Sequence, residues 1–151
     1  MKQELIKYLN KTVQSTVTYS RAGGGAGTII CMDFINNDMK YSLWVDCTWR
    51  IIKGKKIVAT SMGNIAAVKG TIAKGAKIFE NKKVLSVDLL NYYDLHIVFE
   101  NNLELYVFCD ISNPNAYGFK QNWDFSVIHK NLSYTITNNY TIKKGKYDTN
   151  D

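Results

Sequence analysis

The middle of the chain alternates between apolar and polar positions in three successive runs. Because neighbouring side chains of a strand point to opposite faces of a sheet, this period of two predicts β-strands over Val84–Leu90, Asp94–Glu100 and Leu103–Cys109. Asn101 and Asn102 separate the last two runs, and asparagine tolerates the positive φ that a two-residue type I′ turn requires. The pattern therefore predicts an antiparallel meander at the centre of the fold.

A second long alternation lies upstream, in Tyr41–Ile51. One of its faces is apolar, and the other carries Trp44, Asp46 and Arg50, so the run predicts a single long strand with one face in the core. Shorter alternating or β-branched stretches predict further strands, over residues 13–19, 28–35, 57–60, 123–128, 132–136 and 140–142. The polar residues 143–151 predict a frayed tail.

Two stretches have helical spacing instead. Lys2–Lys11 groups Leu5 and Leu9 on one face, which predicts an amphipathic N-terminal helix. Residues 64–74 also share a helical apolar face, but Gly70 interrupts it, so we expect a short or irregular crossover helix there. The 151 residues thus predict one α+β domain, mainly an antiparallel curved β-sheet, which these two helices cover.

A glycine-rich run, Gly23–Gly27, is the most conspicuous local motif. A phosphate-binding loop would need a helix after it and, in a P-loop, a Gly-Lys-Ser/Thr end. Here a strand pattern follows over residues 28–35, and no such lysine is present. The run favours a flexible loop between strands, and a loop that closes over a partner is the functional alternative.

The net charge of +6 leaves nucleic acid, an anionic surface or an acidic protein open as partners. The lysines are spread over turns and the tail, however, which is typical of solvated turn lysines. The first eleven residues are polar, and no apolar run approaches the roughly 18 residues of a membrane span, so we expect a cytoplasmic location.

Cysteine and histidine spacing predicts no metal site and no other cofactor. Cys31, Cys47 and Cys109 lack CxxC spacing and lie in strand patterns, which favours free thiols in a reducing compartment. His96 and His129 are far apart in the sequence.

Candidate functional residues lie on the polar strand faces. Asp94, His96 and Glu100 share one face, and an Asp–His pair could orient a general base. No nucleophile or metal spacing accompanies them, so a solvated face is favoured and no catalytic residue is assigned.

Aromatic and basic residues complete the candidate set. Trp44, Tyr106 and Phe108 would form an interface anchor if they lie exposed together. Arg50 could be buried in a cluster beside Trp44 and Asp88. The partner-binding residues that we predict are Trp44, Arg50, Asp94, His96, Tyr106 and Phe108.

The run YSLWVDCTWRI, followed by KIVATS, KVLSVDL, DLHIVFENNLELYVF and NWDF, resembles a small bacterial domain family with a Trp-Arg strand and a C-terminal tryptophan strand. The resemblance covers roughly residues 40–127. Members of this family are similar to immunity proteins of polymorphic toxin systems. The resemblance implies a non-enzymatic cytoplasmic protein that binds and neutralises a cognate toxin. Because the chain is basic, the expected toxin surface is acidic, or the toxin is not a nuclease.

Two alternatives come from other classes of function. A nucleic-acid-binding module would need an ordered aromatic stripe flanked by lysines on one sheet face. A small-molecule-binding domain would need a pocket with convergent polar groups near Asp94–Glu100.

Overall fold

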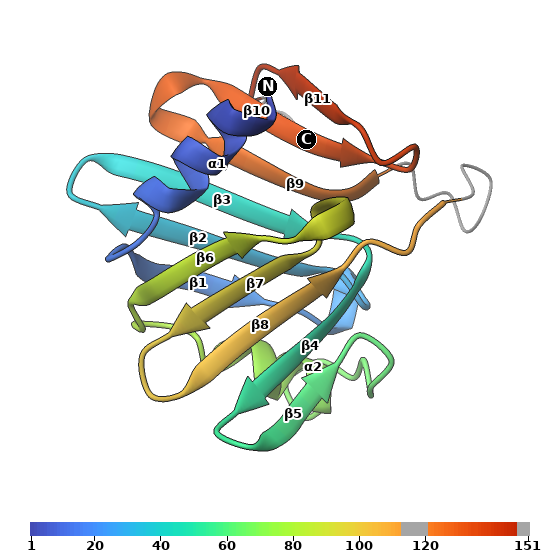
Figure 1. Cartoon of the computed structure of the whole chain (residues 1–151). Coiled ribbons are helices and arrows are strands. Elements are labelled where there is room, and N and C mark those ends of the chain that lie inside the picture. The colour runs from blue at the N-terminus through green and yellow to red at the C-terminus, as the bar shows by residue number, and fades with distance from the viewer. Residues whose placement is uncertain (113–120, 148–151) are drawn as a thin grey trace.

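Two antiparallel sheets form the framework of the computed structural model, which describes residues 1–112 and 121–147 (Figure 1). Sheet A contains, in spatial order, β1 (Thr16–Arg21), β2 (Ile30–Asn36), β3 (Met39–Val45), β9 (Gln121–Val127), β10 (Leu132–Thr137) and β11 (Ile142–Gly145). Sheet B contains, in spatial order, β5 (Lys56–Thr60), β4 (Thr48–Lys53), β8 (Leu103–Phe108), β7 (Leu95–Phe99) and β6 (Val84–Leu89). The predicted α+β fold with antiparallel strands is confirmed, and the strands divide into two sheets.

The core lies between the two sheets. Each strand turns its apolar positions inward, and the largest fully buried side chains include Trp49 from sheet B and Trp123 and Phe125 from sheet A. Burying a large apolar side chain stabilises the fold by about 1.5–3 kcal/mol. This alternation leaves one outer face on each sheet.

Helix α1 (Lys2–Lys11) has the bounds that its apolar spacing predicts. It lies beside β6 and in front of sheet A, where sheet B does not reach (Figure 1). Leu5 and Leu9 are buried in the core. Glu4 accepts a hydrogen bond from the Tyr134 hydroxyl and pairs with Lys144 at 2.7 Å, which ties the helix to β10 and β11.

The central meander matches its prediction. Strands β6, β7 and β8 are consecutive neighbours in sheet B. Asn101 and Asn102 have φ values of 63° and 59°, as the predicted two-residue turn requires.

The prediction of one long strand over Tyr41–Ile51 is wrong. Strand β3 ends at Val45 and β4 begins at Thr48, and the two belong to different sheets. The backbone N–H groups of Asp46 and Cys47 both donate to the carbonyl of Asn122, at 2.9 and 3.0 Å, and hold the corner. The alternation of apolar positions continues through the corner, so the sequence pattern does not reveal it.

The second helix and the C-terminal tail also differ from their predicted bounds. Helix α2 spans Thr71–Lys77 and closes the side of the sandwich between β1 and β5 (Figure 1). Gly75 lies inside the helix because a Cβ there would come within 2.6 Å of the Ala59 Cβ on β5. The predicted tail begins as an edge strand, β11, because lysines are tolerated where one strand edge faces solvent. Residues 148–151 of that tail lie outside the described residues.

The glycine-rich run connects β1 to β2, as the sequence predicts. It contains a single turn, Gly24–Ala26, and no helix suited to phosphate follows it. The N–H of Gly23 donates to the carbonyl of Gly27 at 2.8 Å, and the N–H of Gly24 donates to that of Ile65 at 2.6 Å. Backbone hydrogen bonds therefore tie this loop to the segment before α2. Within the described residues, no helix has the length and apolar character needed to cross a membrane.

Candidate functional site

A stacked ladder of side chains covers the outer face of sheet B. The Arg50 guanidinium lies 5.5 Å from the centre of the Phe108 ring, and the Phe108 and Tyr106 rings stack with centroids 6.1 Å apart. Tyr106 stacks in turn on His96, at 4.1 Å and 11° between planes. His96 Nε2 lies 2.9 Å from a carboxylate oxygen of Glu104. We call these five residues the sheet B ladder.

The strand register explains the ladder. Arg50, Tyr106 and His96 lie directly opposite one another on β4, β8 and β7. Side chains at opposed positions of an antiparallel pair are the closest cross-strand neighbours. Four of the six predicted partner-binding residues therefore come together on one face: Arg50, His96, Tyr106 and Phe108.

The other two predicted residues, Asp94 and Trp44, lie elsewhere. Asp94 accepts a hydrogen bond from the backbone N–H of Cys109 at 2.7 Å, so it fixes the end of β8. Glu100 accepts one from the N–H of Lys83 at 2.6 Å. The Asp94–His96 pair, the alternative to a solvated face, does not form, because Asp94, His96 and Glu100 each contact a different segment.

Trp44 lies on the outer face of sheet A, across the sandwich from Tyr106 and Phe108. The condition for a joint aromatic patch, that the three rings lie exposed together, is therefore not met, and the cause is the corner between β3 and β4. The predicted buried cluster of Arg50 with Trp44 and Asp88 is also wrong. The corner separates Trp44 from Arg50. Asp88 shares the outer face of sheet B with Arg50 but lies opposite His96 on β6, and both Arg50 and Asp88 are exposed.

Two rows of side chains cross the outer face of sheet A, one residue from each strand. The first row is Arg21, Cys31, Trp44, Asp124, Thr135 and Lys143. The second row is Tyr19, Asp33, Ser42, Ser126, Ser133 and Gly145. The middle of this face therefore combines one tryptophan with hydroxyl and carboxylate groups.

Trp44 is 45% exposed, whereas Trp49 and Trp123 are fully buried. Its indole Nε1–H donates to Oδ1 of Asp46 at 2.7 Å, which fixes the ring on the surface. No described aromatic ring stacks on Trp44. Both the orientation of the ring and its free surface suit a contact with another molecule.

Asp124 is held in a network of hydroxyl groups. Ser133 Oγ donates to Asp124 Oδ1 at 2.6 Å, and Thr135 Oγ1 donates to Oδ2 at 3.2 Å. Burial raises the pKa of Asp124, and these two hydrogen bonds offset part of that rise.

Asp46, at the corner after β3, has a similar environment. Burial raises the pKa of Asp46, the hydrogen bonds from Trp44 and Gln121 lower it in part, and the negative charge of Asp124 raises it further. Among the described residues, neither carboxylate forms an ion pair with a lysine or arginine.

A groove of about 590 Å³ runs over these residues. Asp33, Trp44 and Asp124 line it, with serine hydroxyls between them. A second hollow of about 320 Å³ shares Asp124 with it and extends toward Lys143 and Lys146. We call the two hollows, together with Asp46, which accepts the hydrogen bond of Trp44, the sheet A groove. Its floor is acidic and its rim carries cations.

Partly desolvated carboxylates without a described counter-charge are typical of functional sites, because an arriving cation stabilises their charged form beyond what their hydrogen bonds supply. A guanidinium or ammonium group is the chemistry that this floor fits, with its apolar neighbour against Trp44. Metal binding has less support, since the described residues contain no group of three His, Cys, Asp or Glu side chains placed to hold an ion.

Cys31 lies in the groove but is a poor nucleophile. Burial raises the pKa of Cys31 to about 12, with further contributions from the charges of Asp33 and Asp46. Since the thiolate is the reactive form, the thiol stays protonated and inert near neutral pH.

Sequence reasoning identified Trp44 but not Asp33, Asp124 or the hydroxyl groups between them. Asp124 lies between two core residues, Trp123 and Phe125, and that alternation places it on an outer face. Which strands become neighbours depends on the sheet order, which the pattern does not contain.

No protein-family model, no curated protein and no solved structure matches this chain.

Proposed function

We propose that this protein is a non-enzymatic binding protein whose sheet A groove receives a cationic side chain of a protein partner. The more specific form of the proposal is an immunity protein that neutralises a cognate bacterial toxin in the cytoplasm. The observation that carries the binding proposal is the exposed Trp44 beside the desolvated carboxylates of Asp46 and Asp124. The immunity role is supported by the sequence resemblance alone.

Tryptophan and arginine dominate the energetics of protein interfaces, and truncating such a residue to alanine typically costs at least about 2 kcal/mol. Trp44 is already fixed by its bond to Asp46, so little conformational entropy is lost when a partner packs on it. An arginine of the partner could stack on Trp44 and reach the carboxylate of Asp124 across the shared groove.

The local charge of the groove changes the expectation drawn from the net charge. A net charge of +6 pointed to an acidic partner surface. The floor of the groove is acidic, however, and complementarity over a few ångströms depends on the local groups. We therefore expect the partner to place a basic residue at the centre of the contact and acidic groups near Arg21, Lys143 and Lys146.

Nucleic-acid binding is less well supported by either outer face. The floor of the sheet A groove would repel phosphates. The rings of His96, Tyr106 and Phe108 stack on one another, so few ring faces are free for bases, and Glu104 adds a carboxylate.

The experiment is co-expression with the product of the adjacent gene, followed by affinity purification and a growth assay. The proposal predicts a stable complex, relief of toxicity, and loss of both with Trp44→Ala. Tyr106→Ala, in the sheet B ladder, is the matched aromatic control and should retain both. A complex that Trp44→Ala leaves intact would contradict the proposed surface. A neighbour that is not toxic would contradict the immunity role.

A further inference from the structure

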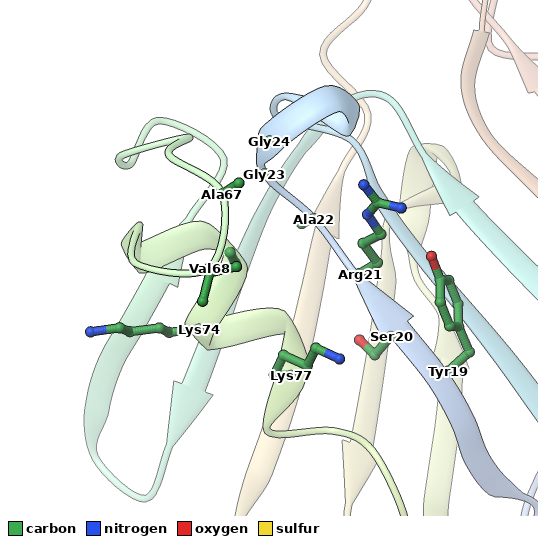
Figure 2. A pocket seen from close by; sticks show the side chains of 11 residues that line it. Tyr19, Ser20, Arg21, Ala22, Gly23, Gly24, Ala67, Val68, Lys74 and Lys77 are labelled. Atoms are coloured by element: carbon green, nitrogen blue, oxygen red, sulfur yellow. The ribbon is translucent and has the colours of Figure 1, made fainter.

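A cavity of about 540 Å³ lies at a third place, between the end of β1 and helix α2 (Figure 2). Its walls are small and mostly apolar, with Ala22, Gly23 and Gly24 on one side and Ala67 and Ala73 on the other. A volume of this size is typical of small-molecule sites. The cavity shares Tyr19 with the sheet A groove, but Asp33, Trp44 and Asp124 do not line it.

The base of this cavity contains an unsatisfied polar group. Ser20 is 0% exposed, and its Oγ has no hydrogen-bond partner among the described residues. A buried hydroxyl without a partner destabilises a fold, so each such group calls for an explanation. A ligand that accepts a hydrogen bond from Ser20 would provide one.

The charged residues that line the cavity are all cationic: Arg21, Lys74 and Lys77. In Figure 2 the Lys77 side chain extends from α2 toward β1, whereas that of Lys74 extends away from β1. Lys77 Nζ lies 3.3 Å from a carboxylate oxygen of Glu80, but its side chain is 69% exposed. Exposed ion pairs are weak, so this lysine can exchange its partner for an anion.

The glycine-rich run makes the wall of the cavity possible. Gly23 and Gly24 have φ values of 79° and 53°, and residues other than glycine adopt such positive values only with strain. A Cβ on Gly24 would come within 3.1 Å of the Ala67 Cβ, and one on Gly23 within 3.3 Å of the Ala73 Cβ. These glycines therefore allow the loop to approach the segment around α2 closely enough to enclose a cavity.

We propose that this cavity binds a small amphipathic anion, such as a carboxylate with an unbranched apolar body. The apolar body lies against Ala22, Ala67 and Ala73, and the carboxylate accepts hydrogen bonds from Ser20 Oγ and Lys77 Nζ. Ser20 has no exposed surface, so a neighbouring side chain moves when the anion binds, and the Lys77 side chain, which extends toward β1 (Figure 2) and is 69% exposed, is free to do so.

The test is titration of the purified protein with octanoate, followed by calorimetry and by ¹H–¹⁵N NMR. Octanoate should bind and shift the amides of Ser20–Gly24 and of α2. Octan-1-ol, which has the same apolar body without the charge, should bind at least 10-fold more weakly. Octylammonium should not bind.

Two pairs of variants separate a ligand site from a structural effect. Ser20→Ala should weaken octanoate binding at least 5-fold while the melting temperature stays equal or rises. Among the described residues, Ser15 carries the other buried hydroxyl without a partner, and it does not line the cavity, so Ser15→Ala should leave binding unchanged. Lys77→Met should weaken binding at least 5-fold, whereas Glu80→Gln breaks the same ion pair and should leave binding equal or tighter.

Absence of octanoate binding at millimolar concentration would overturn the proposal. Equal affinity in the wild type, Ser20→Ala and Lys77→Met would do the same, as would equal affinity for octan-1-ol. None of these readouts involves the sheet A groove, so their failure is distinct from a failure of the proposed function.

Discussion

The two outer faces of this sandwich both combine aromatic rings with charged groups, but they differ in whether the rings and charges meet one another. On sheet B, the charges and rings of the ladder meet one another: Arg50 on Phe108, Tyr106 on His96, and His96 on Glu104. On sheet A, Trp44 has a free ring surface, and Asp46 and Asp124 have no described counter-charge. A face whose groups satisfy one another stabilises the fold, whereas a face that leaves charges without partners is suited to binding.

The comparison predicts its largest effect for Trp44. Trp44→Ala should weaken binding of the partner by about 2–4 kcal/mol, because a fixed aromatic anchor is lost. The matched Tyr106→Ala change on sheet B should alter affinity by less than about 0.5 kcal/mol. Calorimetric titration of both variants with the purified partner measures the difference. Equal losses would mean that the two faces do not divide the roles in this way.

Stability should show the opposite order. Tyr106 takes part in two ring stacks, and each such pair contributes about 0.5–1.5 kcal/mol. Tyr106→Ala should therefore lower the free energy of unfolding by about 1–3 kcal/mol, and Trp44→Ala should lower it by less. Urea unfolding followed by circular dichroism is the measurement, and a larger loss for Trp44→Ala would reverse the assignment.

The pH dependence of stability should expose the desolvated carboxylate of Asp124. Its pKa is raised in the folded state, so between the unfolded value of 3.8 and the folded value the native protein holds more protons than the unfolded chain. The contribution of Asp124 to stability therefore falls as pH rises through this window. At neutral pH the ionised carboxylate of Asp124 destabilises the fold by its full desolvation cost.

Asp124→Asn should accordingly be more stable than the wild type at pH 7, with the advantage shrinking as the pH falls toward 3.8. Thermal melts at several pH values measure it, and Asp88→Asn, at an exposed position of sheet B, serves as the control. If the stability gain of Asp124→Asn over the wild type is smaller at pH 7 than at low pH, the ionised carboxylate of Asp124 does not destabilise the fold. The same variant should bind the partner more weakly, as expected for a group retained for function.

The smallest effect concerns the reactivity of Cys31, and it involves no change in the fold or in partner binding. With its pKa at about 12, its thiolate fraction at pH 8 is lower than that of a free cysteine by a factor on the order of 10³. Alkylation of the folded protein at pH 8 should be slow at Cys31, and denaturant should release all three thiols. Rapid modification of Cys31 in the folded state would show that the groove is more open than the structure describes.

The local sequence pattern was sufficient to predict most of the strands, but not how the strands are arranged into two sheets. The bounds of α1, the turn at Asn101 and Asn102, and the meander β6–β8 follow from spacing and turn chemistry that act within a few residues. The corner at Asp46 and Cys47 is invisible in the pattern, because a change of sheet preserves the alternation of inward and outward side chains.

That single corner explains why the site was predicted only in part. It sends Trp44 to one outer face and Arg50 to the other, although the alternation places them on the same side of one strand. Trp44 and Asp124 are 80 residues apart in the chain and become neighbours only through the pairing of β3 with β9. Contacts of this kind depend on tertiary register, which no local spacing encodes.

The most direct test of the central claim uses the indole N–H resonances of the three tryptophans. Trp49 Nε1 donates to the Thr28 carbonyl and Trp123 Nε1 to that of Tyr93, both in the interior, whereas Trp44 Nε1 donates to Asp46 beside the groove. Titration of ¹⁵N-labelled protein with its partner should shift the Trp44 signal, assigned with Trp44→Phe, and leave the other two in place. A saturated complex in which the Trp44 signal does not move would contradict the sheet A groove as the binding surface.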